Sequence, residues 1–402
     1  MSVLMLAVFT VSVGFGVLLP LLPSLIERLL GPGGGAAEIS RSTGLLTALY
    51  MFALFLFAPV WGGLSDRYGR RLILLIGLTG FGAVTLTFSL IGSLTAVYAE
   101  RFLSGVFAAA VAPVALATIG DLVPTEAARA RRLTFISLAG ITGFLIGPIL
   151  GVAITRGASN LPAFPGSAGS LAVPLVATGV LALLAAIAVA IAMPVTKPVH
   201  GEPPTQRLRA APTRWLIPRL LVLAFIVAAG VGVFEVGLTL LGTQELGLTP
   251  YQIAVMFTEC SLGMFVVQAL VFSPWIKPAT TRWLIAPGLG VLAAGIFLTP
   301  RAAGFTLILA VVGMVAASAG ILSPILTYWV SSTAGGGQGS ALGRLTAASS
   351  IGAAAGSAAG GLLFDVALVP HASFLLATII TASGVLISLG LPHQLTCTPE
   401  GA

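Results

Sequence analysis

Charged side chains are scarce in this chain. Asp, Glu, Lys and Arg make up only 8% of its 402 residues, whereas 57% of the residues are hydrophobic and the mean hydropathy is +1.08. A chain of this length could form two or three soluble domains, but soluble domains carry about 25% charged residues. The scarcity of charge excludes a soluble protein and predicts an integral membrane protein that crosses the bilayer many times.

Residues that carry enzymatic chemistry are also few. Cys260 lies in an apolar segment and Cys397 near the end of the chain, so no disulfide framework is predicted. His200, His371 and His393 fall in predicted loops or at helix ends, without the partners of a catalytic cluster. The chain also lacks the Gly-x-x-x-x-Gly-Lys-Ser/Thr loop that binds nucleoside triphosphates. We expect no enzymatic activity, no ATP-driven transport, no metal and no cofactor.

Acidic residues are fewer than basic ones, twelve against nineteen, which gives a net charge of +7. The basic residues are scattered over short loops and are not gathered with exposed aromatic residues, so a nucleic-acid partner is not expected. With the N-terminus placed inside, fourteen of the nineteen fall on the cytoplasmic side and five outside. Such a bias is typical of membrane proteins. It predicts a multi-pass protein of the inner (plasma) membrane with both termini in the cytoplasm.

Long apolar runs are abundant and predict an all-α membrane protein with twelve transmembrane helices, since about 20 apolar residues cross the bilayer. The predicted spans are 3–27, 42–63, 71–92, 94–119, 132–154, 170–193, 216–241, 250–273, 282–299, 303–330, 341–365 and 371–392. The segment Met1–Leu30 has no basic start and no small-residue cleavage site, so we expect a retained first helix. The polar, proline-rich stretch 194–215 predicts a cytoplasmic linker between two six-helix bundles, 1–193 and 216–402.

A charged hairpin, residues 62–71, separates the second and third predicted spans. Unpaired charge is costly at mid-bilayer, so this hairpin must lie at a membrane face. Its sequence resembles the motif Gly-x-Leu-x-Asp-Arg-x-Gly-Arg-Arg/Lys between helices two and three of the major facilitator superfamily. The matching residues are Gly62, Leu64, Asp66, Arg67, Gly69, Arg70 and Arg71.

This resemblance implies two pseudo-symmetric six-helix bundles and transport by alternating access. Asp66 ends a helix, where a negative charge is unfavourable and needs a donor. The resemblance supplies two donors, the start of helix eleven and the arginines between helices four and five. Those arginines are Arg129, Arg131 and Arg132 in this chain. We expect the cluster to act as a conformational switch that holds the halves together on the cytoplasmic side; the alternative is a loop that only fixes topology.

Arg101 lies within the fourth predicted span, next to Glu100. An arginine inside the membrane is a candidate functional residue. Arg101 and Gly105 match the helix-four motif Arg-x-x-x-Gly of the same superfamily. The resemblance implies that Arg101 lines the central cavity and takes part in handling protons or substrate. The alternative is that Arg101 extends to the outer headgroups, assisted by Glu100.

The fifth predicted span contains small residues at intervals of three and four, which allow helices to pack closely. It resembles the motif Gly-x-x-x-Gly-Pro-x-x-Gly-Gly of drug–proton antiporters, with Gly143, Gly147, Pro148 and Gly151 in place and Val152 at the last position. The resemblance implies export and a similarity to the tetracycline-exporter branch. The alternative is ordinary packing in a chain that contains 49 glycines.

Coupling to a proton gradient requires a carboxyl group in the membrane that can change its charge. Glu235 and Glu259 are the candidates, because burial favours the neutral form of a carboxyl group and a cationic partner favours the charged form. For each, the alternative is a structural carboxyl group.

The predicted cavity has few strong polar anchors, which favours a lipophilic or amphipathic small molecule. Residues that could face it are Phe15, Phe107, Phe234, Met314 and Tyr328, although aromatic residues and methionines at helical spacing more often face lipid or lie in the core. We therefore predict a monomeric, proton-coupled exporter of drug-like molecules, with protons and the bilayer as its other partners. Metabolite uptake or facilitated diffusion is the alternative, and a non-transporting membrane sensor is a third.

Overall fold

The computed structural model describes residues 1–31, 34–90, 92–122, 126–158, 172–194, 215–271, 278–302, 304–333, 338–366 and 369–391. Every regular element within these residues is a helix. The elements are, in chain order, α1 (Ser2–Leu18), η1 (Leu19–Leu21), α2 (Leu22–Leu30), α3 (Ala36–Tyr68), α4 (Arg70–Leu86), η3 (Thr87–Leu90), α5 (Leu94–Ala108), α6 (Val111–Leu122), α7 (Glu126–Ala158), α8 (Val173–Ala192), α9 (Leu216–Leu240), η6 (Leu241–Glu245), α10 (Pro250–Val271), η7 (Pro278–Leu284), α11 (Ile285–Leu298), η8 (Thr299–Arg301), α12 (Phe305–Thr333), α13 (Gln338–Leu362) and α14 (Ala372–Leu389).

These elements form twelve spans, as predicted. Five spans combine several elements, namely α1 with η1 and α2, α4 with η3, α5 with α6, α9 with η6, and α11 with η7 and η8. Ten spans in the described part of the chain are long and apolar enough by themselves to cross a membrane. The other two are α4, which has 17 residues and continues into η3, and α13, which is rich in Gly, Ala and Ser.

Several helices extend beyond the apolar runs that predicted them. Both α3 and α7 have 33 residues, whereas the predicted spans were 42–63 and 132–154. At about 1.5 Å per residue, each measures about 50 Å, longer than the hydrocarbon core of a bilayer. Polar residues continue the helix past the apolar part because the backbone hydrogen bonds remain satisfied there. The start of α7 at Glu126 places Arg129, Arg131 and Arg132 in helix and not in the predicted loop.

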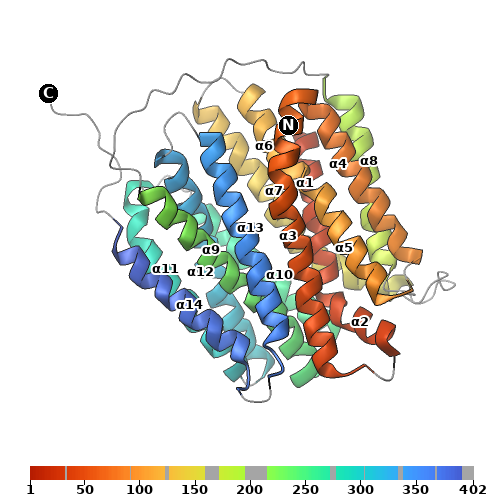
Figure 1. Cartoon of the computed structure of the whole chain (residues 1–402), viewed down its shortest axis with the longest axis vertical. Helices are drawn as coiled ribbons and strands as arrows, with labels where there is room; N and C mark the ends of the chain where they lie inside the picture. The colour runs from red at the N-terminus through yellow and green to blue at the C-terminus, as the bar shows by residue number, and fades with distance from the viewer. Residues whose placement is uncertain are drawn as a thin grey trace.

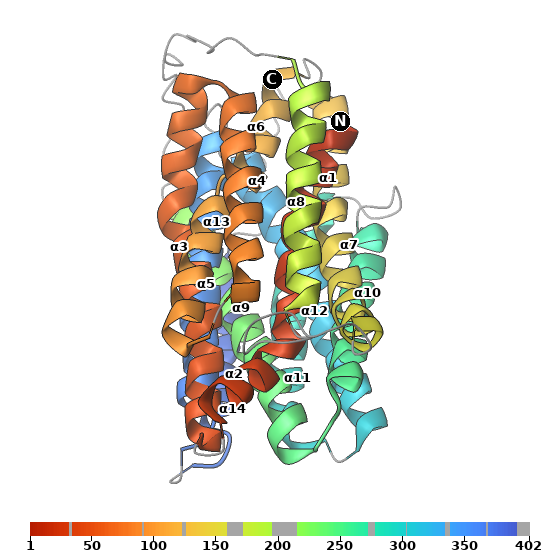
Figure 2. The ribbon, with the colours of Figure 1, turned by 90° about the vertical axis from the view of Figure 1, so that its right-hand side faces the viewer.

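The first span is not a single α-helix. It passes through the short 3₁₀ turn η1, which contains Pro20, and continues as α2, which begins with Leu22 and Pro23. Proline has no N–H group to donate, so two prolines three residues apart interrupt regular helical bonding. As a result α2 runs obliquely at the end of the bundle (Figure 2).

The described helices form two groups that lie side by side, α1–α8 and α9–α14 (Figure 1). The second group has a hydrophobic core built only from its own residues, between Leu216 and Leu391. The first group has its own buried clusters, one of which runs from Leu4 to Met193. Of the predicted linker 194–215, residues 195–214 lie outside the described part of the chain.

Glycines of α13 pack directly on the backbone of α9. A Cβ atom on Gly352 would collide with the carbonyl oxygen of Phe225, and one on Gly356 with that of Ala229. Both pairs are spaced by four residues, so one face of each helix is in contact along its length. The same arrangement joins α7 to α1 in the other half, as described below for the helix-five motif.

We refer to the two ends of the bundle as the N-terminal face, where α1 begins and α3 ends, and the opposite face, where α2 ends and α3 begins (Figure 1). The halves contact each other at the opposite face. A Cβ atom on Gly44 of α3 would lie 2.6 Å from the Cα atom of Gly361 of α13. Gln244 of η6 accepts a hydrogen bond from the Ser40 hydroxyl and donates one to the Ala36 carbonyl oxygen, both at 3.2 Å.

Toward the N-terminal face the halves separate. Met51, further along α3 than Gly44, lines a cavity between them. A Cβ atom on Gly62 or on Gly343, which lie near the N-terminal face on α3 and α13, would meet no described atom within 4 Å. The same two helices are in tight contact at the opposite face and diverge toward the N-terminal face (Figure 1). The molecule is closed at the opposite face and open at the N-terminal face.

Candidate functional site: a cavity between the two halves

A cavity of about 290 Å³ lies between the two halves. One of its residues comes from the first half, Met51 of α3, and the others come from four helices of the second half. Those residues are Ala224, Val227, Ala228, Val231, Gly232 and Glu235 of α9, Met264 of α10, Ala319, Ser323, Leu326 and Thr327 of α12, and Leu345, Ser349, Ser350 and Ala353 of α13. The lining is mainly aliphatic, with hydroxyl groups on α12 and α13.

Glu235 is the one charged residue among those that line this cavity. Its side chain is partly exposed there, and no described residue forms an ion pair or hydrogen bond with its carboxylate. A negative charge in an apolar cavity without a basic partner attracts either a proton or an organic cation. The cavity can therefore bind an amphipathic molecule through aliphatic contacts, with one carboxylate to neutralise a positive charge.

Glu259, the second carboxyl group predicted from the sequence, lies on α10 and does not line the cavity. Its Oε2 atom is buried without a hydrogen-bond partner. The thiol of Cys260 lies within electrostatic range of both Glu259 and Glu235. The two predicted carboxyl groups therefore belong to neighbouring regions of the second half, but only Glu235 faces the open space.

Arg101 is buried in the first half and forms a bidentate ion pair with the adjacent residue Glu100. The Nε and Nη2 atoms each lie 2.6 Å from a carboxylate oxygen. Both side chains are buried, so Arg101 does not extend toward headgroups with Glu100 beside it. The Cζ atom of Arg101 lies 5.7 Å from the centre of the Tyr50 ring, a cation–π distance.

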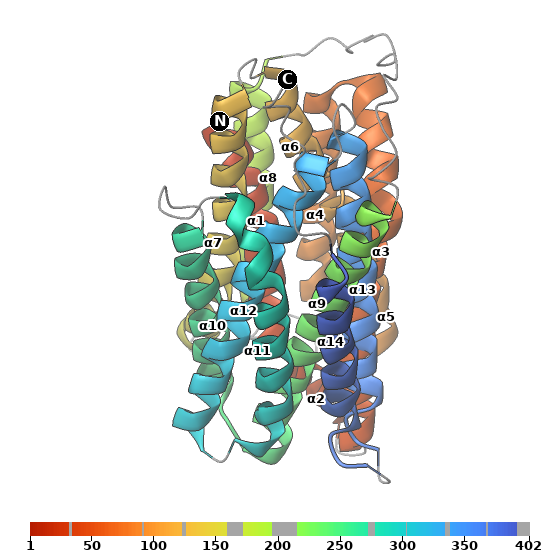
Figure 3. The ribbon, with the colours of Figure 1, turned by 90° about the vertical axis from the view of Figure 1, so that its left-hand side faces the viewer.

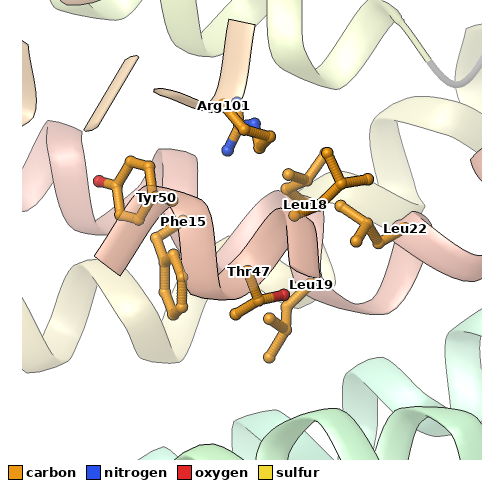
Figure 4. Close-up of a pocket in the computed structure, with 8 residues that line it drawn as sticks. Phe15, Leu18, Leu19, Leu22, Thr47, Tyr50 and Arg101 are labelled. Atoms are coloured by element: carbon orange, nitrogen blue, oxygen red, sulfur yellow. The ribbon is translucent and has the colours of Figure 1, made fainter. Parts of the chain in front are cut away.

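A row of aromatic side chains leads from this ion pair toward the other half. The ring of Phe15 stacks on Tyr50 at 5.5 Å and on Phe144 at 5.7 Å. Phe144 in turn meets Phe257 of α10 edge-on at 6.4 Å. Arg101, Phe15 and Tyr50 also border a small void of about 10 Å³, which has room for about one water molecule. Figure 4 shows Arg101 opposite these two rings, with leucines alongside.

The charged hairpin lies at the N-terminal face, where α3 meets α4. Asp66 has a 64% exposed side chain and bonds to Arg70 at 2.5 Å, a pair four residues apart. Arg70 also donates to the Ser65 hydroxyl, and Arg71 donates to the carbonyl oxygen of Ala190 at the end of α8.

Other hairpin residues have structural roles. Gly69 has φ +97°, a conformation that side chains disfavour, so it permits the sharp turn between the helices. Leu64 packs against the core of the first half. Arg67 lies over the Tyr68 ring.

Of the expected partners of Asp66, only Arg132 has a described side chain, and it forms no ion pair with Asp66 among the described residues. Arg132 is exposed in the first turns of α7, and the side chains of Arg129 and Arg131 lie outside the described residues. The N-terminal turn of α13 begins at Gln338, and its first side chains are likewise outside them. In the described part of the chain Asp66 pairs with Arg70 of its own hairpin, and the predicted switch remains a prediction.

The helix-five motif lies on the face of α7 that contacts α1. A Cβ atom on Gly147 would lie 2.9 Å from the Val13 carbonyl oxygen, and one on Gly151 would lie 3.1 Å from that of Val17. Gly143 is closer still, since a Cβ atom there would collide with the Phe9 carbonyl oxygen of α1. Pro148 is enclosed in the continuous helix α7, and its ring also faces α1.

The five residues that could face the cavity do not line it. Phe15 lies beside Arg101, Phe107 packs near Trp61, Phe234 is buried in the core of the second half, and Tyr328 meets Trp329 edge-on. Met314 is also absent from the lining. The structure thus favours the alternative, a position in the core or facing lipid, because hydropathy shows which residues are apolar, whereas the neighbouring helices decide which face of a helix is covered.

Conversely, sequence reasoning missed Tyr50 and the serines Ser349 and Ser350. A lone tyrosine in an apolar run was a usable signal for Tyr50, because a buried tyrosine needs a partner for its polar end. The serines carried no such signal, since serine also occurs in helices that only pack closely.

Comparisons with known proteins agree with this geometry. The family described as Major Facilitator Superfamily matches residues 4–336. Multidrug resistance protein 2 of Bacillus subtilis (strain 168) is 27% identical over 392 residues, which cover 97% of this chain and 93% of that protein. Quinolone resistance protein NorA of Staphylococcus aureus is 25% identical over 388 residues, covering 96% of this chain and 95% of NorA.

Two solved structures share the fold. The human organic anion transporter MFSD10 (TETRAN) superposes with a TM-score of 0.75 at 20% identity, over 96% of this chain and 98% of that one. A D-xylose-proton symporter gives the same TM-score at 14% identity, over 97% of each chain. At these identities the likeness concerns the fold alone.

Proposed function

Because this chain belongs to the major facilitator superfamily, a family of membrane transporters, we propose that it exports lipophilic or amphipathic small molecules in exchange for protons. The observation that carries this proposal is the cavity between the halves, which opens toward the N-terminal face and contains one unpaired carboxylate, Glu235. We place the N-terminal face in the cytoplasm of a cell whose plasma membrane the protein spans, with both termini inside, in agreement with the distribution of basic residues.

The chemistry of the cavity supports this type of substrate. A sugar or a phosphate needs a cluster of hydrogen-bonding groups or paired arginines, whereas this lining offers aliphatic groups, two methionines and four hydroxyls. Methionine is flexible and adapts to ligands of different shape. The relatives support the direction, since their names describe resistance to drugs or quinolones.

Substrate and protons can be exchanged across the membrane if a single carboxylate is accessible first from one side of the membrane and then from the other. In the conformation described here Glu235 faces the cytoplasm and takes up substrate after it has released its proton. Closure at the N-terminal face and opening at the opposite face then expose the same carboxylate to the outside. A proton arriving there neutralises Glu235, weakens its attraction for a cationic group and releases the substrate.

The experiment that tests this proposal uses inside-out vesicles with an acidified lumen. A pH-sensitive dye reports lumenal pH while lipophilic cations, tetracyclines and phenicols are added in turn. A substrate should cause the lumen to lose protons, because each transport step carries a proton out as substrate enters. If no compound of the panel changes the lumenal pH although the protein is verified in the membrane, drug export is contradicted and a metabolite carrier is favoured.

Substitution of Glu235 tests the role of the carboxylate. We expect Glu235→Gln to abolish substrate-induced proton release, because an amide cannot exchange a proton. Glu245→Gln is the matched control, since Glu245 lies at the opposite face within 3.5 Å of His371 and away from the cavity. If Glu235→Gln keeps full coupling, Glu259→Gln becomes the decisive variant. Full coupling in both would exclude the two predicted carboxyl groups as the proton site.

A further inference from the structure

A second cluster of polar side chains, unrelated to the cavity, lies at the N-terminal face of the second half. Arg282 in η7 is only 9% exposed. Its Nη2 atom donates to the carbonyl oxygen of Leu391, just after α14. Its Nη1 atom is buried and has no hydrogen-bond partner. A buried guanidinium with an unused donor is costly, because the donor has lost its water without gaining an acceptor.

A second arginine reaches the same place from another helix. Arg219, in the first turn of α9, donates from Nη1 to the carbonyl oxygen of Gly390 at 2.7 Å. The two arginines, from different helices, thus bind the carbonyl oxygens of two consecutive residues, Gly390 and Leu391. Among the described residues neither arginine forms an ion pair with a carboxylate. In the described part of the chain, the two positive charges thus meet carbonyl oxygens at the end of α14 and, for Arg282, the ring of Trp283, but no carboxylate.

Capping of α14 accounts for part of this arrangement. Basic side chains often bind the last carbonyl groups of a helix and favour its negative end. Each arginine uses one nitrogen to bind a carbonyl oxygen at the end of α14. Capping therefore does not explain why the second nitrogen of Arg282, the buried Nη1, has no acceptor. The position of Arg219 is also unfavourable by itself, because a cation near the start of α9 opposes the helix dipole. An anionic ligand would resolve both features.

The surroundings indicate where this anion comes from. Trp215 and Trp283 flank the two arginines and are strongly exposed, as are Leu386 and Leu389 on the last turns of α14. Tryptophan is enriched at the level of the lipid headgroups, and exposed leucines face acyl chains. Figure 3 shows α9, α11 and α14 next to one another on this side of the molecule.

We propose that Arg219 and Arg282 bind the phosphate group of an anionic membrane lipid in the leaflet at the N-terminal face, with its acyl chains along α14. Arginine matches the oxygen pairs of a phosphate with parallel N–H donors. Basic pockets between transmembrane helices are known to bind lipid headgroups in this way. The nitrogen without a partner then receives a charged acceptor.

The test is native mass spectrometry of the purified full-length protein with short-chain phosphatidylglycerol, and with phosphatidylcholine as the zwitterionic comparison. We expect phosphatidylglycerol to remain bound to the protein in the mass spectrum. Phosphatidylcholine should not displace it, because the arginines repel the choline cation. Arg282→Gln should weaken phosphatidylglycerol binding about tenfold, the usual effect of losing a charged hydrogen bond. Arg301→Gln is the matched control, since Arg301 binds the Phe297 carbonyl oxygen at the other end of the same span.

Loss of binding through misfolding is separated from loss of the site by two further variants. Arg282→Lys keeps the charge but not the paired donors, so binding should be intermediate while thermal stability stays close to that of the wild type. Arg219→Gln alters an exposed side chain and should weaken binding without unfolding the protein. If Arg282→Gln and Arg219→Gln bind phosphatidylglycerol like the wild type, the proposal is wrong.

The free headgroup distinguishes a lipid from a soluble anion. Glycerol phosphate, added without acyl chains, should bind at least tenfold more weakly than phosphatidylglycerol, because it lacks contacts with α14. Equal binding of the two would overturn the lipid assignment and indicate a site for soluble phosphate. If Arg301→Gln weakens phosphatidylglycerol binding as much as Arg282→Gln does, the lipid site is also contradicted. The loss would then reflect the lower net charge of the protein and not a specific site.

Discussion

At the scale of single residues, the most consequential feature is a pair of opposite charges placed where water is absent. Glu100 and Arg101 are both buried, and each satisfies the other through two hydrogen bonds. A buried ion pair contributes little net stability, but removal of one member leaves an uncompensated charge. Tyr50, whose ring faces the guanidinium, is part of the same unit.

Glu100→Gln should therefore be strongly destabilising, by about 3 to 5 kcal/mol, since it leaves Arg101 charged in an apolar environment. The double variant Glu100→Gln, Arg101→Met should recover much of the loss, because no charge is then buried. The measurement is the apparent Tm of purified protein in detergent. Equal Tm values for the single and the double variant would contradict this account.

At the scale of helices, close packing through small residues is repeated in the two halves. Gly147 and Gly151 place α7 on the backbone of α1, and Gly352 and Gly356 place α13 on that of α9. In a bilayer, helices gain little from hydrophobic contact and depend on such close approach. The helix-five motif thus has a structural counterpart in the second half.

Gly356→Val should separate α13 from α9 and lower both Tm and the amount of protein in the membrane, because a side chain would collide with the Ala229 backbone. Gly343→Val is the matched control on the same helix, since no described atom lies within 4 Å of a Cβ atom there. A similar Tm for the two variants would show that α13 does not depend on this contact.

At the scale of the whole molecule, the two halves contact each other at one face and are apart at the other. The contact pairs Gly44 with Gly361, whereas a Cβ atom on Gly62 at the far end of α3 would meet no described atom within 4 Å. A rocking motion of the two rigid halves would open the opposite face and close the N-terminal face, as expected of transporters built from repeats.

Gly44→Val should bias the protein toward opening at the opposite face, because the added side chain cannot fit against Gly361. The distance between spin labels placed on α3 and α13 at that face should increase and broaden. Gly63→Val, which meets nothing described within 4 Å, serves as the comparison. Unchanged distances in Gly44→Val would mean that the closure does not depend on this contact.

Asp66→Asn should abolish transport and leave protein in the membrane, because the switch requires a negative charge at the N-terminal face when that face closes. Among the described residues Asp66 pairs with Arg70 in the open conformation, and because the Asp66 side chain is largely exposed, this pair stabilises the fold by less than about 1 kcal/mol. Asp365→Asn, the same exchange at an exposed position after α13, is the control. Normal transport by Asp66→Asn at normal expression would exclude the switch.

The sequence by itself determined the class, the number of spans and the family. These follow from local quantities: the length of each apolar run, the placement of basic residues and the motif from Gly62 to Arg71. Glu235 and Glu259 were also recognisable as candidates, because carboxyl groups within apolar runs are rare. The ends of α3 and α7 were not, since polar residues continue a helix without any change in periodicity.

Only the tertiary structure decided which side chains share a site. Glu235 lines the cavity and Glu259 does not, although both are single acids in apolar helices. Phe234, one residue before Glu235, is buried in the core instead of facing the cavity. The physical reason is that successive residues of a helix point in directions about 100° apart. Which direction meets open space is set by helices far away in the chain, and by which face of the molecule is closed.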